Sequence, residues 1–220
     1  MVGYRLSTYG SPLRTAPGRR PGRYHSGEEE SPTHYVCLHP LGPFAELLRG
    51  HGLRTPEQVR HVRERTWALR LELEGLPELT FANAHEFGLE PAELVSDDAS
   101  ECRALAVRLR QGGVPGIVVP SAALPATQNG VLFGPRVASP YLLQPMGAVD
   151  VPASITAHDG RPIVGLLDRV RFSGDPHAGF EAWQRGEELA FDEPGWELVR
   201  GEGRRSQPSQ ATASSSALQI

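Results

Sequence analysis

The sequence predicts an α+β domain of short strands and helices joined by long loops. Apolar residues make up 39% of the 220 residues and charged residues 22%, which is typical of a globular protein with a hydrophobic core. The 24 glycines and 20 prolines favour short elements over a helical bundle. Some segments alternate apolar and polar residues, whereas others have apolar residues at i, i+3 and i+4, so both strands and helices are expected.

The N-terminal part of the chain carries two strand patterns separated by a loop. Residues 3–9 alternate in the manner of a strand. Residues 10–34 are rich in Pro and Gly and contain an acidic run, as expected of a solvated loop. Residues 34–39 form the next strand pattern, in which Tyr35 and Val36 point to opposite faces.

A short amphipathic helix is expected after Pro43. Its apolar stripe has the spacing i, i+3, i+4 and i+7, and the stripe consists of Phe44, Leu47, Leu48 and His51. Glycines at 50 and 52 end the helix. Glu46 lies about 150° around the helix from the centre of the stripe, at about 100° per residue. The side chain of Glu46 therefore faces either solvent or a polar cleft.

The middle of the chain mixes helix and strand signals. Thr55 is expected to cap a helix with Pro56 in its first position. Residues 67–73 alternate as in a half-buried strand, and residues 79–81 are a further strand candidate.

The clearest helix is expected to begin with Ser96 as its cap and to end at Gly112. Its apolar stripe consists of Cys102, Leu105, Ala106 and Leu109. Buried strands are expected at residues 114–120 and 131–133, on either side of a loop over residues 121–130.

The C-terminal part carries weaker signals. One or two strands are expected over residues 161–172 and a short helix over residues 180–189. These signals divide the chain into a main domain over residues 1–140, an extension over residues 141–202 that packs on or extends this domain, and a disordered tail over residues 203–220, which is rich in Ser and Gln.

Composition excludes several function classes. All 22 basic residues are Arg, so Schiff-base lysine chemistry is excluded and a phosphate site must use Arg or backbone amides. The net charge of −4 gives no reason to expect direct nucleic-acid or membrane binding. The two cysteines lie in apolar patterns and are expected to be reduced core thiols of a cytoplasmic protein. Neither a secretory signal nor a membrane span is expected.

The motifs of several common enzyme classes are missing. The sequence contains no GxGxxG, Walker, HExxH or GxSxG motif. His158 and His177 have no partner at metal-ligand spacing, so no metal site is expected.

Five residues are candidates for a polar site, and each also has an ordinary structural explanation. Arg23 suits a bidentate phosphate contact or is a surface-loop arginine. Glu46 suits a sugar hydroxyl and a developing positive charge, or is simply solvated. Tyr35 is a site residue or a half-buried strand residue. Ser121 ends a buried strand, where ligand crevices occur, or serves as a turn residue, and Asn129 lies in an Asn-Gly turn.

Considered together, four segments resemble the RES domain, a family named for its Arg, Glu and Ser. The resemblance extends from Tyr4 to about Arg136. The segments are PGRY (21–24), HYVCL (34–38), FAELL (44–48) and GGVPGIVVPSAALPATQNGVLFGPRV (112–137). Residues 87–113, upstream of the last segment, resemble the family's helix with its acidic N-terminus. The segment around Ser121 is the most specific.

The resemblance implies a split, mostly antiparallel sheet core with peripheral helices, as in ADP-ribosyltransferase toxins. It also implies a bacterial toxin of a toxin–antitoxin pair that depletes NAD by cleaving the nicotinamide–ribose bond. The acceptor would be water (glycohydrolase) or phosphate as co-substrate (phosphorylase). NAD would be the substrate, no true cofactor would be needed, and the partner would be an Xre-like helix-turn-helix antitoxin.

The resemblance also implies a role for each matched residue. Arg23, with the adjacent Tyr24, would bind the NAD phosphates, Tyr35 would line the nicotinamide side and Glu46 would contact the ribose. Ser121 would hydrogen-bond the substrate, and Asn129 is a lesser candidate for NAD binding. Two alternatives remain open. One is a toxin that ADP-ribosylates a protein, and the other is an inactive module that binds NAD or ADP-ribose.

Overall fold

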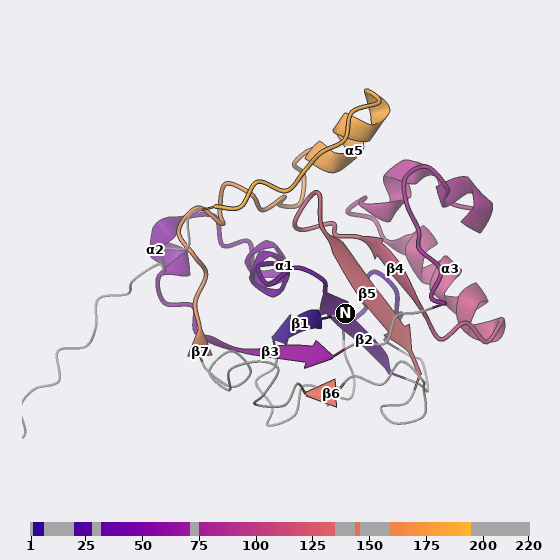
Figure 1. Cartoon of the computed structure of the whole chain (residues 1–220), viewed down its shortest axis with the longest axis horizontal. Coiled ribbons are helices and arrows are strands. Elements are labelled where there is room, and N and C mark those ends of the chain that lie inside the picture. The colour runs from indigo at the N-terminus through magenta and orange to yellow at the C-terminus, as the bar shows by residue number, and fades with distance from the viewer. Residues whose placement is uncertain are drawn as a thin grey trace, which may run out of the picture.

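The fold is built on an antiparallel sheet with helices packed against it (Figure 1). The computed structural model describes residues 2–6, 20–27, 32–70, 75–134, 144–145 and 159–194. The strands are β1 (Val2–Leu6), β2 (Thr33–Cys37), β3 (Glu64–Arg70), β4 (Gly116–Pro120), β5 (Gln128–Phe133), β6 (Gln144–Pro145) and β7 (Asp159–Gly160). The helices are α1 (Gly42–His51), α2 (Pro56–Val59), α3 (Ser100–Gln111) and α5 (Ala178–Gln184), with the 3₁₀ helices η1 (Ala84–Phe87) and η2 (Pro91–Leu94). The predicted α+β class is confirmed.

The strands follow the order β4-β5-β2-β1-β3, and the short pairing between β1 and β2 divides the sheet into two parts. β6 and β7 both pair with β3 at one edge. In the centre, β1 and β2 meet at the pair Tyr4–Cys37, whereas β2 and β5 are in register over the full length of β2. Because Tyr35 lies opposite Val131 and Cys37 lies opposite Asn129, these side chains share one face of the sheet.

Two groups of helices cover this face. The α3–η layer packs over β4, β5 and β2 through a core that includes Ile117, Val119 and Val131. Helix α1 packs toward β1 through a second core that includes Phe44 and Leu48. Figure 1 shows α1 and α3 on either side of β2 and β5. The polar residues between these two cores are the candidates for a site.

Residues 161–172 do not form the predicted strands. They form successive turns, in which the amide of Leu166 donates to Ile163 and the amide of Arg169 donates to Leu166. Their apolar residues join the core beneath α1. The prediction failed because a turn can bury alternate apolar residues as effectively as a strand does. The helix predicted over residues 180–189 exists as α5, but it begins at Ala178 and ends at Gln184, so residues 185–189 are not helical.

Other elements follow the sequence with specific corrections. The strands predicted at residues 3–9 and 34–39 are β1 and β2, and the predicted helix after Pro43 is α1. The Thr55 cap is confirmed, since its side chain accepts from the Gln58 amide. His51, expected in the buried stripe of α1, is exposed because the core ends before the last turn.

Two boundaries and one strand were predicted wrongly. Helix α3 begins at Ser100 rather than after Ser96, because residues 96–98 form a turn in which the Asp98 amide donates to the Ser96 hydroxyl at 3.2 Å. The predicted strand at residues 79–81 is reduced to a parallel bridge between Glu78 and Val118. Within the predicted loop over residues 121–130, β5 already begins at Gln128.

Some predictions lie outside the described residues. These include the tail over residues 203–220, most of the extension between residues 141 and 158, and much of the loop over residues 10–34. Within the described ranges, no helix has both the length and the apolar character needed to cross a membrane. Both cysteines are buried and free, as predicted.

Candidate functional site

Glu46 lies on the side of α1 that faces β5. The Nδ2 group of Asn129 donates a hydrogen bond of 3.0 Å to its Oε1. Asn129 can reach it because the pairing of β5 with β2 turns Asn129 toward the covered face of the sheet. The polar-cleft alternative for Glu46 therefore describes its position better than simple solvation does.

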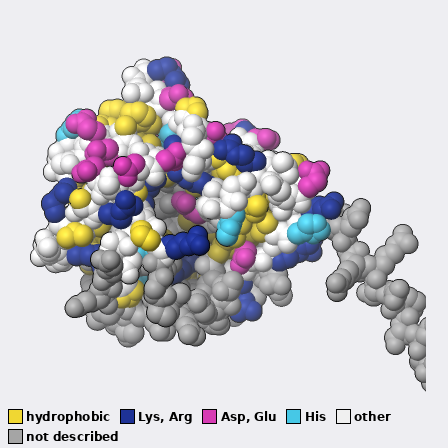
Figure 2. Space-filling model, turned by 180° about the vertical axis from the view of Figure 1, so that it is seen from behind, with side chains coloured by type: hydrophobic (Ala, Val, Ile, Leu, Met, Phe, Trp, Pro, Cys, Tyr) yellow, Lys and Arg dark blue, Asp and Glu magenta, His cyan; other side chains and the backbone are white. Residues whose placement is uncertain are grey.

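The Glu46 carboxyl is accessible to solvent and yet partly desolvated by the surrounding protein. This loss of hydration raises its pKa, although the Asn129 hydrogen bond and the charges of Arg49 and Arg23 lower it. An accessible carboxyl with a raised pKa is typical of a group in a recess. Figure 2 shows a hollow on one face of the molecule, with acidic and basic side chains in and around it.

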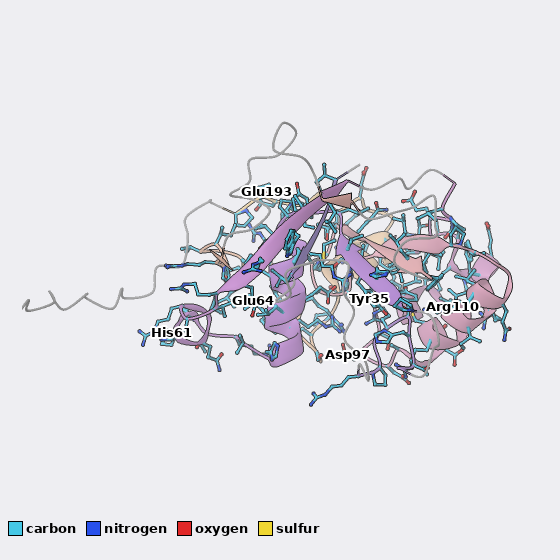
Figure 3. The ribbon with its side chains drawn as sticks, turned by 90° about the horizontal axis from the view of Figure 1, so that it is seen from below. Tyr35, His61, Glu64, Asp97, Arg110 and Glu193 are labelled. Atoms are coloured by element: carbon cyan, nitrogen blue, oxygen red, sulfur yellow. The ribbon has the colours of Figure 1, made fainter. Side chains whose placement is uncertain are left out.

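Arg49 is a neighbour of Glu46 that sequence reasoning missed. It follows Glu46 by three residues on α1, so the two side chains lie on neighbouring parts of the helix surface. Its guanidinium donates to the Ala122 carbonyl and, at 2.6 Å, to Oδ1 of Asp97, which is labelled in Figure 3. Desolvation and the neighbouring Arg171 are the main causes that lower the pKa of Arg49. The i+3 spacing to Glu46 was the signal that could have identified it.

Asp97 joins three parts of the chain. Besides Arg49, its carboxylate accepts from Arg171 at 2.7 Å and from the Gly174 amide at 2.7 Å. Burial alone would raise the pKa of Asp97, but these donors outweigh it and the pKa is lowered. A segment near the C-terminus thereby fixes an arginine beside Glu46.

Arg23 extends from its turn toward the loop that precedes α3. Its NH2 group donates to the Ser96 carbonyl at 2.6 Å, and its NH1 group approaches the Glu93 carbonyl at 3.4 Å. Its positive charge also acts on Glu46. These bonds use only part of the five N–H donors of the guanidinium, so the group is oriented and keeps donors for a ligand.

Tyr35 fixes the turn that carries Arg23. Its hydroxyl accepts a hydrogen bond of 2.9 Å from the amide of Tyr24 and lies 2.9 Å from Nδ1 of His25. The Tyr24 side chain is 1% exposed and belongs to the core under α3. Burial raises the pKa of Tyr24 well above its ordinary value. The structure thus places Tyr35 next to the turn that carries Arg23, and the Tyr24 side chain in the core below this turn.

Ser121 is also buried, with 1% of its surface exposed. Its hydroxyl accepts from the Leu124 amide at 3.1 Å, and its carbonyl lies 3.0 Å from Nε2 of His177. The structure brings together Arg23, Tyr35, Glu46 and Asn129, and Arg49 joins them; we refer to these five residues as the Glu46 cluster. Tyr24 and Ser121 support the cluster from inside the protein.

The described part of the chain offers no site for a metal ion, since it contains no group of three or more His, Cys, Asp and Glu side chains that could hold one. The Glu46 cluster itself supplies one carboxyl, two guanidinium groups, a phenol and an amide.

Comparisons with known proteins identify the family to which the chain belongs. The family model described as "RES domain" matches residues 4–149, more than half of the chain. No curated protein matches. A chain of the crystal structure of the MbcT–MbcA toxin–antitoxin complex of M. tuberculosis is similar in fold, with a TM-score of 0.56 and 21% identity over 77% of this chain and 88% of that chain. The predicted resemblance is confirmed, and the chain belongs to the RES-domain family.

Proposed function

We propose that this protein is the toxin of a toxin–antitoxin pair and that it cleaves the nicotinamide–ribose bond of NAD. The observation that carries the proposal is the Glu46 carboxyl, which is held by Asn129 at 3.0 Å and lies within the electrostatic influence of Arg23 and Arg49. Membership of the RES-domain family and the fold shared with a chain from a toxin–antitoxin complex support it.

The reaction needs a negative charge next to the ribose. As the bond to nicotinamide breaks, positive charge develops on the sugar, and a carboxylate held in place stabilises this charge without having to reorganise. The hydrogen bond from Asn129 fixes one oxygen of Glu46. The positive charges of Arg49 and Arg23 favour the ionised form of Glu46 against the effect of desolvation.

The two arginines suit the other end of the substrate. NAD carries a pyrophosphate, and guanidinium groups match phosphate oxygens in both charge and geometry. Arg23 is oriented by the Ser96 carbonyl, and Arg49 by Asp97. We assign the main pyrophosphate contact to Arg23, because Arg49 already shares its charge with Asp97 and a carbonyl oxygen.

The other residues that match the family differ in how deeply they are buried in the protein, and we assign their roles accordingly. The half-buried Tyr35 is assigned to the nicotinamide side of the site. Because Tyr24 and Ser121 are each 1% exposed, we assign them a positioning role beneath the site rather than direct contact with NAD. His177 binds the Ser121 carbonyl and so contributes to the same support.

Proton NMR of the purified protein with NAD, in the presence and absence of phosphate, tests the proposal. Release of nicotinamide demonstrates the bond cleavage. The second product distinguishes the acceptors, because ADP-ribose indicates water and ADP-ribose-1″-phosphate indicates phosphate. Glu46→Gln should slow the reaction by about 10²–10³-fold, the usual effect of losing one electrostatic contact. Glu101→Gln, an exposed acid on α3, is the matched control.

Other outcomes would redirect the proposal. If NAD remains intact with the wild-type protein and calorimetry still shows NAD binding, the protein is a binding module. If radiolabel from NAD appears on a protein, the acceptor is a protein and the enzyme is an ADP-ribosyltransferase. A separate experiment tests the proposed antitoxin partner. Co-expression with a helix-turn-helix protein encoded by a neighbouring gene should restore growth, and the two proteins should co-purify.

A further inference from the structure

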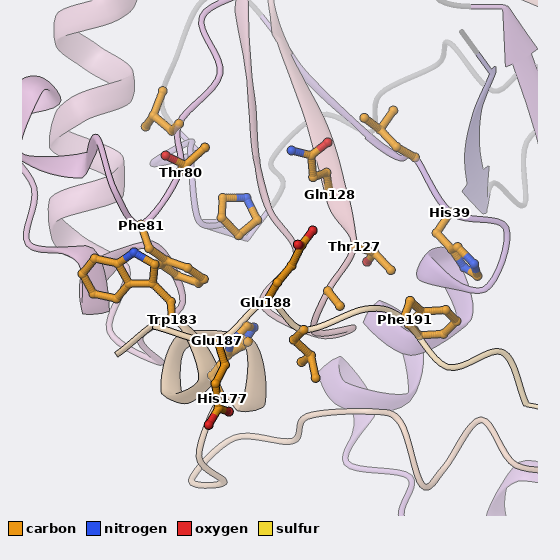
Figure 4. Close-up of a pocket in the computed structure, with 16 residues that line it drawn as sticks. His39, Thr80, Phe81, Thr127, Gln128, His177, Trp183, Glu187, Glu188 and Phe191 are labelled. Carbon is orange, nitrogen blue, oxygen red and sulfur yellow. The ribbon is translucent and has the colours of Figure 1, made fainter. Parts of the chain in front are cut away.

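A cavity of about 510 Å³ lies at the end of the sheet where β4 leads into β5 (Figure 4). Pro120 at the end of β4 and the consecutive residues Ala126, Thr127 and Gln128 before and at the start of β5 line it. The cavity lies between the segment that carries α5 and the turn that joins β4 to β5. No residue of the Glu46 cluster lines it, so it is separate from the proposed NAD site.

Aromatic and aliphatic side chains form one wall of the cavity. The rings of Phe81 and Trp183 lie 5.9 Å apart, and Phe180 packs against both at 5.4 and 5.7 Å. Trp183 is 38% exposed and Leu189 is 41% exposed, and both line the cavity. Exposed tryptophan and leucine next to a concave site are typical of surfaces that bind a partner.

The charge in the cavity is negative. Figure 4 shows the carboxylate of Glu188 directed into the space, and it makes no hydrogen bond or ion pair with the residues that the structure describes. The neighbouring Glu187 turns away and pairs with Arg185 at 2.8 Å. Of the residues that line the cavity, none is an arginine.

The two histidines of the cavity do not neutralise Glu188. Burial lowers the pKa of His177, and its Nδ1 accepts from the Phe180 amide at 3.0 Å, so His177 is neutral with its proton on Nε2. His39 lies 2.7 Å from Glu193 and so already has its own carboxylate. Glu188 therefore remains available to a cation from outside.

We propose that this cavity is a docking site for an arginine side chain of a partner protein, flanked by an apolar residue. A guanidinium can pair with the Glu188 carboxylate while its flat face stacks on the Trp183 ring. The flanking apolar residue would cover Trp183 and Leu189, which the protein alone leaves exposed. The volume is in the range of specific small binding sites, about 300–1,000 Å³, and accommodates one such side chain with its neighbours.

Titration of the full-length ¹⁵N-labelled protein with acetyl-Leu-Arg-Leu-amide tests the proposal, because the indole N–H signal of Trp183, assigned with Trp183→Phe, reports on the cavity. We expect that signal to shift, with a dissociation constant of about 1 mM. The same peptide with citrulline, which has the shape of arginine without its charge, should bind more weakly, by up to about fivefold. Glu188→Gln should weaken the arginine peptide similarly, and Glu181→Gln, an exposed acid on α5, should not.

Three results would overturn the proposal. The first is an unchanged Trp183 signal at saturating peptide. The second is equal binding of the arginine and citrulline peptides, or equal binding by the wild-type protein and Glu188→Gln, since the charge pair would then contribute nothing. The third is equal affinity for n-butylguanidinium and the peptide, which would make the cavity a site for a free small cation.

Discussion

The phenolic oxygen of Tyr35 accepts a hydrogen bond of 2.9 Å from the backbone amide of Tyr24. A side chain from the sheet thus holds the turn that presents Arg23, the residue between Gly22 and Tyr24. Since Tyr35 is fixed by the pairing of β2 with β5, the strands determine where the Arg23 guanidinium lies. The hydroxyl of Tyr35 therefore links the fold to the proposed phosphate contact.

Tyr35→Phe should loosen this turn without removing the ring. The Tyr24 amide would lose its partner, which typically costs about 1–3 kcal/mol of unfolding free energy when the group is buried. We expect the KM for NAD to rise more than kcat falls, because Arg23 would lose its orientation. Chemical denaturation and nicotinamide-release kinetics measure the two effects. Tyr4→Phe on β1 is the control, and an unchanged KM in Tyr35→Phe would contradict the link.

Gly22 is required by the same turn. A Cβ at position 22 would lie 2.5 Å from the His25 ring and 3.1 Å from the Tyr35 hydroxyl, so the turn would have to open. Gly22→Ala should therefore reduce NAD cleavage by displacing Arg23 and lower the melting temperature. Gly50→Ala is the matched control, because nothing lies within 4 Å of its Cβ. As a helical position, Gly50→Ala should instead stabilise the protein by about 0.5–1 kcal/mol. Equal activity of the two variants would contradict the prediction.

The sequence predicted most elements whose signal is local. The apolar stripe of α3 and the cap at Thr55 are confirmed because short-range hydrogen bonds and periodicity decide them. The Ser96 cap was wrong for a tertiary reason, since the Ser96 carbonyl receives Arg23 and its hydroxyl serves a turn before the helix. Long-range contacts of this kind leave no pattern in a single sequence.

The candidate site shows the same contrast between local signals, which the sequence reveals, and long-range contacts, which it does not. The resemblance identified residues of the Glu46 cluster, and the geometry of α1 indicated that Glu46 points away from the core. The pairing of Arg49 with Asp97 was missed because the two residues are 48 positions apart in sequence, although the i+3 spacing of Arg49 to Glu46 was a local signal. Conversely, the burial of Ser121 could not be read from its position at the end of a strand, because His177 and the 121–124 turn enclose it.

Asp97→Asn tests how far the C-terminal segment supports the site. The lowered pKa of Asp97 means that its carboxylate stabilises the folded state above the unfolded pKa, and that this contribution is lost as the pH falls through the folded value. The variant should therefore melt below the wild type at neutral pH, and the difference should shrink in acid. Asp168→Asn, at an exposed aspartate of the same segment, is the matched control.

The NAD-cleavage activity of Asp97→Asn is a second test of the role of Asp97. Arg49 and Arg171 would lose their shared carboxylate and repel each other, so Arg49 should leave its place beside Glu46. We expect NAD cleavage to fall along with stability. Full activity at a temperature where the variant is folded would show that Arg49 does not depend on Asp97.

Glu46 should make NAD cleavage fall in acid. The proposed reaction requires the carboxylate form of Glu46, and desolvation raises the pKa of Glu46, so kcat/KM should decrease as the pH falls through that pKa. Arg49→Gln removes a charge that lowers this pKa and should move the acid limb of the activity profile to higher pH, whereas Arg103→Gln on α3 should leave it in place.

The raised pKa of Glu46 also means that the ionised carboxylate weakens the fold. Stability is therefore greatest below the unfolded pKa and declines as the pH rises through the folded value. Glu46→Gln should therefore melt above the wild type at neutral pH while losing activity, and the gain in melting temperature should vanish in acid. A gain that is independent of pH would show that the carboxylate is not desolvated in the folded protein.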